Sequence, residues 1–389
     1  MRRTLLAVAA LVLCFQATSA MAYYGWASGR ILFYETRTYA APAGQGPYTT
    51  AMKNTWRGLP NVKVYILVNG TSTVIGTGAT DSSGNFNVYW SSAVSNPSIT
   101  MNFYYESAFN LSGTPRFRIA TDSGGNWVSW TYPITGSNYT TSAFGNLYYG
   151  SSTDPHKLCT MFATANDFWV TLGQYSTNLI NRLSGVQVRF PVASASTGLT
   201  VSRQQIQMAD NWVVFNNSTL SHEFGHVVQE IEFEQDSLWG DCSWNGNSHS
   251  WDSVEWQSCA GTEGWADFVA AATFFYQGAT APTSYGYNIE TGCSGSNEWS
   301  ESNVARMFWD IYDSVNESGD GVQQPFYWLV DKWNIFADGT SNRQDREGAS
   351  NQNGLNAWDF YYHALYSGNG TNVDVQAPLE HNCLYNSQW

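Results

Sequence analysis

The chain has 389 residues, of which 43% are hydrophobic and 16% aromatic, and its formal net charge is −14. That length exceeds the roughly 250–300 residues at which one hydrophobic core stops growing, so we expect two domains, and the hydrophobic content excludes wholesale disorder. The excess of acidic residues argues against nucleic acids and anionic membranes as partners, because both require a basic surface.

The segment 1–22 has the organisation of a secretory signal peptide. Two arginines precede an apolar run over 5–15, and small residues offer cleavage after Ala20 or Ala22. The run is too short to span about 30 Å of hydrocarbon. No later stretch reaches the roughly 18 consecutive apolar residues of a spanning helix. We therefore expect a secreted, extracellular protein without a transmembrane segment, or a periplasmic one in a Gram-negative bacterium.

Residues 23–150 carry strand signals throughout. Branched aliphatic residues alternate with other residues over 62–68. Two similar Asp/Ser/Gly turns, at 79–86 and 120–127, each lead into an aromatic strand, which is the pattern of β-hairpins. Several short strands joined by regular turns are typical of a sandwich. We therefore predict an all-β sandwich over 23–150.

The segments 58–66 and 80–86 resemble prealbumin-like, carboxypeptidase-regulatory-type sandwich domains. No chemical constellation stands out in this half. Its role stays open between an accessory domain that supports folding and a domain that binds glycan, protein or a cell surface through exposed aromatic residues.

Every cysteine other than Cys14 lies after residue 150. An oxidising compartment favours disulfides. Because the number of these cysteines is odd, at most two bridges form and a thiol is left over, and the pairing stays open. The change in cysteine usage places the domain boundary near residue 150, with 145–152 as the candidate hinge. The cysteines after the boundary are Cys159, Cys242, Cys259, Cys293 and Cys383.

The periodicity over 151–389 changes from strands to helices. Such a mixture predicts an α+β, mostly helical domain, so the whole chain is expected to be multidomain. We expect helices over 167–184, 218–234, 261–276, 302–315, 324–336 and 354–366, and short strands over 186–190, 204–208 and 212–215.

The strongest chemical motif is Ser-His-Glu-Phe-Gly-His over 221–226. On a helix, His222 and His226 are spaced at i and i+4 and share a face, so two imidazoles can hold one metal ion. Glu223 can then approach the attacking water as a general base. The alternative is a buried histidine pair held by hydrogen bonds alone.

A second helix supplies carboxylates that complete a metal site. A catalytic zinc ion takes three protein ligands and keeps one position open for water. Glu263 can be the third ligand, and Asp267, one turn later, can hydrogen-bond a ligating imidazole. The alternatives are a solvated carboxylate pair, or Glu255 as the third ligand.

The His-Glu-x-x-His helix followed by Glu-x-x-x-Asp on a second helix resembles the gluzincin zinc metallopeptidases. The sequence Glu-Gly-Trp-Ala-Asp-Phe, which begins at Glu263, is most similar to the Glu-Gly-Trp-Ser-Asp-Phe of the fungalysin branch. This resemblance implies a zincin-type metallopeptidase domain over 151–389. It implies that His222, His226 and Glu263 bind zinc, that Glu223 is the catalytic base, and that Asp267 orients His222.

The helix 303–312 also resembles the helix that follows the site in that group. The interval between His226 and Glu263 is longer than in the fungalysin or thermolysin-like enzymes, and this leaves the subfamily and the cleavage specificity open.

The resemblance further implies a downstream histidine or tyrosine that stabilises the oxyanion, and no motif selects it. Calcium is a weaker second metal candidate at the acidic turn 313–321. The strand 212–215 is placed to pair with an extended peptide substrate. The oxyanion candidates are Tyr361, Tyr362, His363, His381 and Arg306.

These observations predict a secreted, zinc-dependent endopeptidase that acts on protein or peptide substrates. Two alternatives stay open: a surface binding protein or adhesin with a non-catalytic zinc site, and a narrow-specificity peptidase for glycoproteins or cell-wall peptides. The sequence does not indicate the biological substrate, the mode of activation or the oligomeric state.

Overall fold

The structure is a computed structural model of the whole chain. It describes residues 23–108, 110–111, 114–120, 129–134, 142–150, 154–175, 183–192, 198–199, 205–209, 217–233, 250–253, 257–290, 293, 300–315, 322–334, 357–366 and 373–384. Four predicted features lie outside these residues. They are the signal peptide, the turn at 120–127 apart from position 120, the strand 212–215 and Glu255.

The chain folds into two compact units. The first unit comprises residues up to Leu32 together with Gly58–Tyr104 and Ser129–Leu147. The second comprises Phe33–Arg57, Tyr105–Val128 and Tyr148–Trp389. Two segments from before residue 150 thus group with the C-terminal unit, so the structure divides the chain differently from a single boundary at that position.

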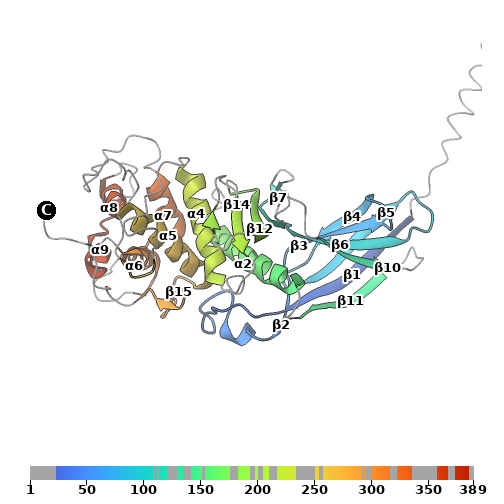
Figure 1. Cartoon of the computed structure of the whole chain (residues 1–389), viewed down its shortest axis with the longest axis horizontal. Helices are drawn as coiled ribbons and strands as arrows, with labels where there is room; N and C mark the ends of the chain where they lie inside the picture. Colours follow the sequence, from blue (N-terminus) through green and yellow to red (C-terminus); the bar gives the residue numbers. More distant parts are fainter. Residues whose placement is uncertain are drawn as a thin grey trace, which may run out of the picture. The chain divides into compact units, whose positions relative to one another are not determined.

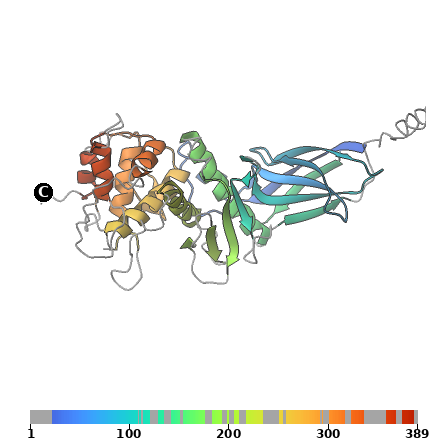
Figure 2. The same ribbon diagram turned by 90° about the horizontal axis from the view of Figure 1, so that it is seen from above.

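The first unit is built from antiparallel strand pairs that form two layers (Figures 1 and 2). One layer pairs β1 with β5, and the other contains the pairs β3–β4 and β6–β10. Phe86 and Phe103 connect the layers, with ring centroids 5.7 Å apart. This arrangement agrees with the predicted N-terminal β-sandwich. The strands are β1 (Tyr23–Tyr34), β3 (Val62–Val68), β4 (Val74–Ala79), β5 (Asn85–Ser92), β6 (Ile99–Ser107), β10 (Ser129–Ile134) and β11 (Ser142–Tyr149).

The predicted hairpin at 79–86 is wrong, although the turn itself is present. Asp81 accepts hydrogen bonds from the backbone N–H groups of Ser83 and Asn85, both at 2.8 Å. The chain then crosses to the other layer, because β5 pairs with β1 and β4 pairs with β3. Gly76 and Gly78 let β4 approach β5 closely: a Cβ at either glycine would come within 2.6 Å of β5 atoms.

The second unit combines a small, mainly parallel sheet with helices. β12 runs parallel to both β9 and β14, and β13 runs antiparallel to β14. The strands are β9 (Phe117–Ala120), β12 (Val186–Val192), β13 (Gly198–Leu199) and β14 (Gln205–Ala209). The helices are α2 (Asp154–Tyr175), α4 (Asn217–Phe233), α5 (Gln257–Phe274), α6 (Glu301–Tyr312), α7 (Phe326–Asn334), α8 (Ala357–Tyr366) and α9 (Gln376–His381).

Short elements complete this unit, and the hairpin β15–β16 is the one that reaches the site described below. They are η1 (Thr50–Met52), β2 (Trp56–Gly58, at the edge of the unit), β7 (Asn110–Leu111), β8 (Thr114–Pro115), β15 (Thr283–Ser284) and β16 (Tyr287–Asn288). Of the described residues, none forms a helix long and apolar enough to cross a membrane.

Helix α2 begins at Asp154, well before the predicted start at residue 167. Its first half is buried on every side, as at Leu158, Met161 and Phe162, so no amphipathic stripe marks it in the sequence. Two threonines bond back to carbonyls one turn earlier: Thr160 to His156 and Thr164 to Thr160. These bonds satisfy hydroxyl groups that have no access to solvent.

Helix α5 packs against both α4 and α6 (Figure 1). A glycine lies at each of these two contacts. A Cβ at Gly225 of α4 would lie 2.7 Å from Ala266 Cα of α5. A Cβ at Gly264 of α5 would lie 2.6 Å from Val304 Cβ of α6. Small residues at these positions allow the backbones to approach, and α4 and α5 therefore face each other at close range along the motif residues.

The segment 33–57, here called the strap, is fixed to α2 by buried charges. Arg37 Nη1 donates to Asp167 Oδ2 at 2.7 Å, and Arg37 Nη2 donates to Glu35 Oε2 at 2.8 Å. Burial opposes the charge of Arg37, but Glu35 and Asp167 outweigh it and raise the Arg37 pKa. Tyr48 lies under the guanidinium, 4.2 Å from its carbon to the ring centroid.

The cysteines behave as expected for an oxidising compartment. Cys293 is bonded to Cys383, and Cys259 is also in a disulfide. Cys159 is a buried free thiol on α2, and burial raises its pKa to about 12. The thiol is therefore protonated and unreactive at neutral pH.

Candidate metal centre

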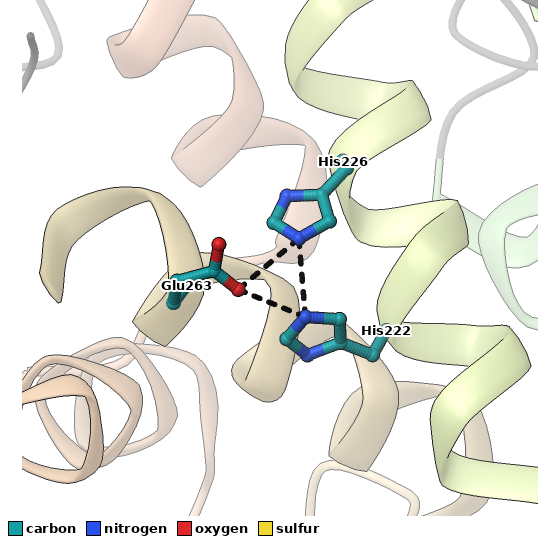
Figure 3. A group of neighbouring side chains, drawn as sticks. All are labelled: His222, His226 and Glu263. Carbon is teal, nitrogen blue, oxygen red and sulfur yellow. Dashed lines mark hydrogen bonds and ion pairs between the residues drawn. The ribbon is translucent and has the colours of Figure 1, made fainter. Parts of the chain in front are cut away.

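Three ligand atoms converge between α4 and α5 (Figure 3). His222 Nε2 lies 3.0 Å from Glu263 Oε2, and His226 Nε2 lies 3.2 Å from the same oxygen. The two Nε2 atoms are 3.1 Å apart. Among the described residues, these three side chains make up the group that could hold a metal ion.

The spacing of these atoms fits a tetrahedral ion. Bonds of about 2.0–2.1 Å in tetrahedral geometry hold neighbouring ligand atoms roughly 3.3 Å apart. The observed 3.0–3.2 Å is therefore close to what an ion bound by all three requires. Two imidazoles and one carboxylate are also a donor set that zinc accepts while keeping a fourth position open.

The helices bring these side chains together in a way the local sequence explains. His222 and His226 are one turn apart on α4, and Glu263 and Asp267 are one turn apart on α5. Gly225 permits the close approach of the helices, and Trp265 Nε1 donates to the Gly225 carbonyl at 3.3 Å. The side chains of both carboxylates are buried, which excludes the solvated carboxylate pair.

Asp267 occupies the position expected of a carboxylate that orients a ligand. Its Oδ1 lies 2.8 Å from His222 Nδ1, so the ring donates from Nδ1 and presents the Nε2 lone pair to the metal position. On the other histidine, Gln229 Oε1 lies 3.2 Å from Nδ1 and has the same effect. Sequence reasoning missed Gln229, although its i, i+3 spacing from His226 is a signal that would find it.

The electrostatics of the site favour an ionised carboxylate. Burial alone would raise the pKa of Glu263, but His226 and His222 outweigh it and hold that pKa well below its usual range. Burial would likewise lower the pKa of His222, but Tyr285, Asp267 and Glu263 outweigh it and raise the pKa well above its usual range. A metal ion that binds His222 would therefore displace a proton from its imidazole.

Glu223 follows His222 on α4 and is itself buried, with 7% of its surface exposed. It is not one of the three clustered ligand residues. Burial raises the pKa of the Tyr285 phenol, and the Asp267 and Glu223 carboxylates add to the rise.

Two residues of the β15–β16 hairpin belong to the site and were missed from the sequence. The Tyr285 ring lies 5.7 Å from the His222 ring, edge to face. Ser284 Oγ donates to Asp267 Oδ1 at 3.4 Å. A Ser-Tyr-Gly-Tyr run is a turn signal and carries no sign of metal chemistry, so the sequence offered no basis for placing it here.

Two of the predicted oxyanion candidates, His381 and Arg306, form hydrogen bonds with other side chains. His381 Nδ1 lies 2.8 Å from Asp310 Oδ2, and Arg306 Nη1 donates to Asn303 Oδ1 at 3.2 Å. Tyr361 is half-buried on α8, and the side chains of Tyr362 and His363 lie outside the described residues. The choice of oxyanion residue stays a prediction, as does calcium at 313–321, of which only residues 313–315 are described.

Comparison with known proteins gives one family match. Residues 184–358 match the family model of the mycolysin C-terminal domain. The matched region includes α4 and α5 with their motif residues. No curated protein matches the chain. The family match supports a metallopeptidase-related protein, and thus a hydrolase that acts on protein substrates.

A 9R-lipoxygenase structure from Cyanothece PCC8801 was also found. It is 16% identical over 41% of this chain and 24% of its own, with a TM-score of 0.20. A likeness at that level carries no argument about fold or function.

Proposed function

We propose that this protein is a secreted zinc-dependent endopeptidase with a zincin-type catalytic domain. The proposal rests on the positions of His222 Nε2, His226 Nε2 and Glu263 Oε2, which lie about as close to one another as the ligand atoms of a single metal ion. Asp267 lies within hydrogen-bonding distance of the other ring nitrogen of His222. The family match supports the same class independently. The signal-like segment 1–22 supports secretion.

A zinc ion held by these three residues would supply Lewis acidity, which would polarise the scissile carbonyl and lower the pKa of the attacking water. The protein's own groups do the rest. Glu223 accepts a proton from the attacking water and delivers it to the nitrogen of the leaving amine. Asp267 keeps His222 in the tautomer that leaves Nε2 free to ligate.

The proposal is tested with Glu223→Gln, which keeps the shape of the side chain and removes its basicity. We expect unchanged zinc content and a loss of casein hydrolysis on the order of 10²–10⁴-fold, the usual contribution of general acid–base catalysis. Glu380→Gln changes an exposed glutamate on α9 and serves as the matched control.

The outcomes separate the alternatives. Stoichiometric zinc in the unaltered protein, without hydrolysis of any member of a peptide library, would favour a binding protein. Hydrolysis confined to glycoproteins or cell-wall peptides would favour the narrow-specificity peptidase. Equal activity of Glu223→Gln and the unaltered protein would contradict the proposed mechanism.

A further inference from the structure

The turn between β15 and β16 holds a tyrosine in a backbone conformation that tyrosine rarely adopts. Tyr285 has φ +49° and Gly286 has φ +89°. A two-residue hairpin turn with both central residues left-handed favours Asn, Asp or Gly at each position. Gly286 meets this preference, whereas Tyr285 does not. Such outliers persist only where the surrounding structure enforces them.

The strap provides that enforcement. Tyr39 Oη donates to the Tyr285 carbonyl at 2.7 Å, across a sequence separation of 246. The ring of Tyr39 also packs against the turn, because a Cβ at Gly286 would lie 3.1 Å from it. Tyr39 is itself fixed to the start of α4: its backbone N–H donates to Asn217 Oδ1 at 2.9 Å, and Asn217 Nδ2 donates to its carbonyl at 2.8 Å.

The enforced turn directs two side chains at the proposed metal centre. The Tyr285 ring lies edge to face against the His222 ring, and its hydroxyl shares a hydrogen bond with Thr219, one turn earlier on α4. Ser284 is fully buried and donates to the same Asp267 oxygen that accepts from His222. A continuous series of contacts thus runs from α4 through Asn217, Tyr39 and Tyr285, and returns to α4 at His222.

We infer that Ser284 and Tyr285 are positioning residues for the His222–Asp267 pair, and that Tyr39 of the strap holds them in place. The inference rests on the proposed function, in which His222 binds zinc. Ser284 orients the carboxylate, and Tyr285 fixes the plane of the imidazole. The strap, which lies far from the motif in sequence, thereby becomes part of the metal centre.

The test measures zinc affinity by competition with a chromophoric chelator, using the full mature chain. Three variants each remove one contact. Ser284→Ala removes the hydroxyl that donates to Asp267, and Tyr285→Gly removes the ring that packs on His222. Tyr39→Phe removes the hydrogen bond to the carbonyl of Tyr285. Groups that support a ligand from behind contribute about 10–100-fold to metal affinity, and we expect losses in this range for Ser284→Ala and Tyr285→Gly. Tyr39→Phe is expected to weaken binding in the same direction.

Ser284→Ala separates positioning from a merely structural role, because it removes one hydroxyl and is expected to leave thermal stability nearly unchanged while its zinc affinity falls. Tyr285→Gly relieves the strain at φ +49° but loses the packing of the ring, so its thermal stability is measured beside its zinc affinity. The visible absorption of bound Co²⁺ reports the geometry of the site and is expected to change in Tyr285→Gly and Ser284→Ala. Tyr327→Phe, on the exposed face of α7, is the control and is expected to match the unaltered protein.

This inference would be overturned if the three folded variants kept the zinc affinity and the Co²⁺ spectrum of the unaltered protein. The proposed function would not be affected by that result. The variants are Ser284→Ala, Tyr285→Gly and Tyr39→Phe. Failure of the unaltered protein to bind zinc would instead refute the proposed function. The positioning role would be refuted with it, because His222 would then have no metal ion to bind.

Discussion

At the scale of single residues, the second unit contains buried charged side chains that are paired with opposite charges. Glu35 and Arg37 are both fully buried, and Asp167 completes their group. Removing one partner from such a group leaves an unpaired buried charge, which is strongly destabilising. Glu263 shows the same principle with imidazoles in place of a guanidinium.

Glu35 makes the stability of this unit dependent on pH. Burial alone would raise its pKa, but Arg37 and Arg57 outweigh burial and lower it below the usual value near 4.5. The folded state therefore gains stability from this carboxylate above its unfolded pKa, and loses that gain as pH falls through the lower folded value.

The expected result is that the free energy of unfolding falls more steeply below about pH 5 in the unaltered protein than in Glu35→Gln. Urea unfolding between pH 3 and 7 measures both slopes. Exposed Glu380→Gln is expected to follow the unaltered protein. Identical slopes for Glu35→Gln and the unaltered protein would show that Glu35 is not paired as described.

At the scale of elements, the contact between α4 and α5 determines whether the site exists. Both histidines lie on α4, and Glu263 and Asp267 lie on α5. The distance between the helices is limited by Gly225 against the backbone of Ala266. A side chain at residue 225 would therefore act on the metal centre without contacting an ion.

Gly225→Ala is expected to destabilise the protein by about 1–3 kcal/mol, as overpacking of a close contact does, and to reduce zinc binding by moving the helices apart. Urea unfolding and the zinc competition assay measure the two effects. Gly150→Ala is the control, because a Cβ there meets no atom within 4 Å. Stability equal to the control would mean that the helices are not in this close contact.

Helix periodicity explains why the motif residues could be predicted. The spacing of His222 and His226, and of Glu263 and Asp267, is encoded within one turn of each helix. That the two helices face each other was predicted from the need of a catalytic zinc ion for a third protein ligand and from the resemblance to the gluzincins. The distances in the structure agree with that prediction, while the roles of these residues stay proposals.

The rest of the site was not predictable because its contacts join distant segments. Tyr39 and Tyr285 are separated by 246 positions, and neither lies in a periodic pattern. Asn217 is a natural N-cap residue, yet its side chain bonds both backbone groups of Tyr39. The first half of α2 was not predicted for a different reason. A helix that is buried on every side shows no amphipathic pattern in its sequence.

At the scale of the whole molecule, the length of the chain predicted two domains, and the structure has two compact units. The length did not reveal how the chain is shared between them. Every cysteine after the signal-like segment lies beyond residue 150. The strap nevertheless groups with the second unit, where Arg37 is paired with Asp167 across a separation of 130. An N-terminal truncation that removes residues 33–57 would thus remove part of the second unit as well.

Zinc-edge anomalous diffraction from crystals of the mature protein would show whether one zinc ion is bound between α4 and α5. We predict a single strong peak within about 2.0–2.2 Å of His222 Nε2, His226 Nε2 and a Glu263 carboxylate oxygen, the distances expected for zinc. A peak that is not coordinated by Glu263, or the absence of a peak between α4 and α5 in zinc-loaded crystals, would show that these residues do not form the proposed zinc site.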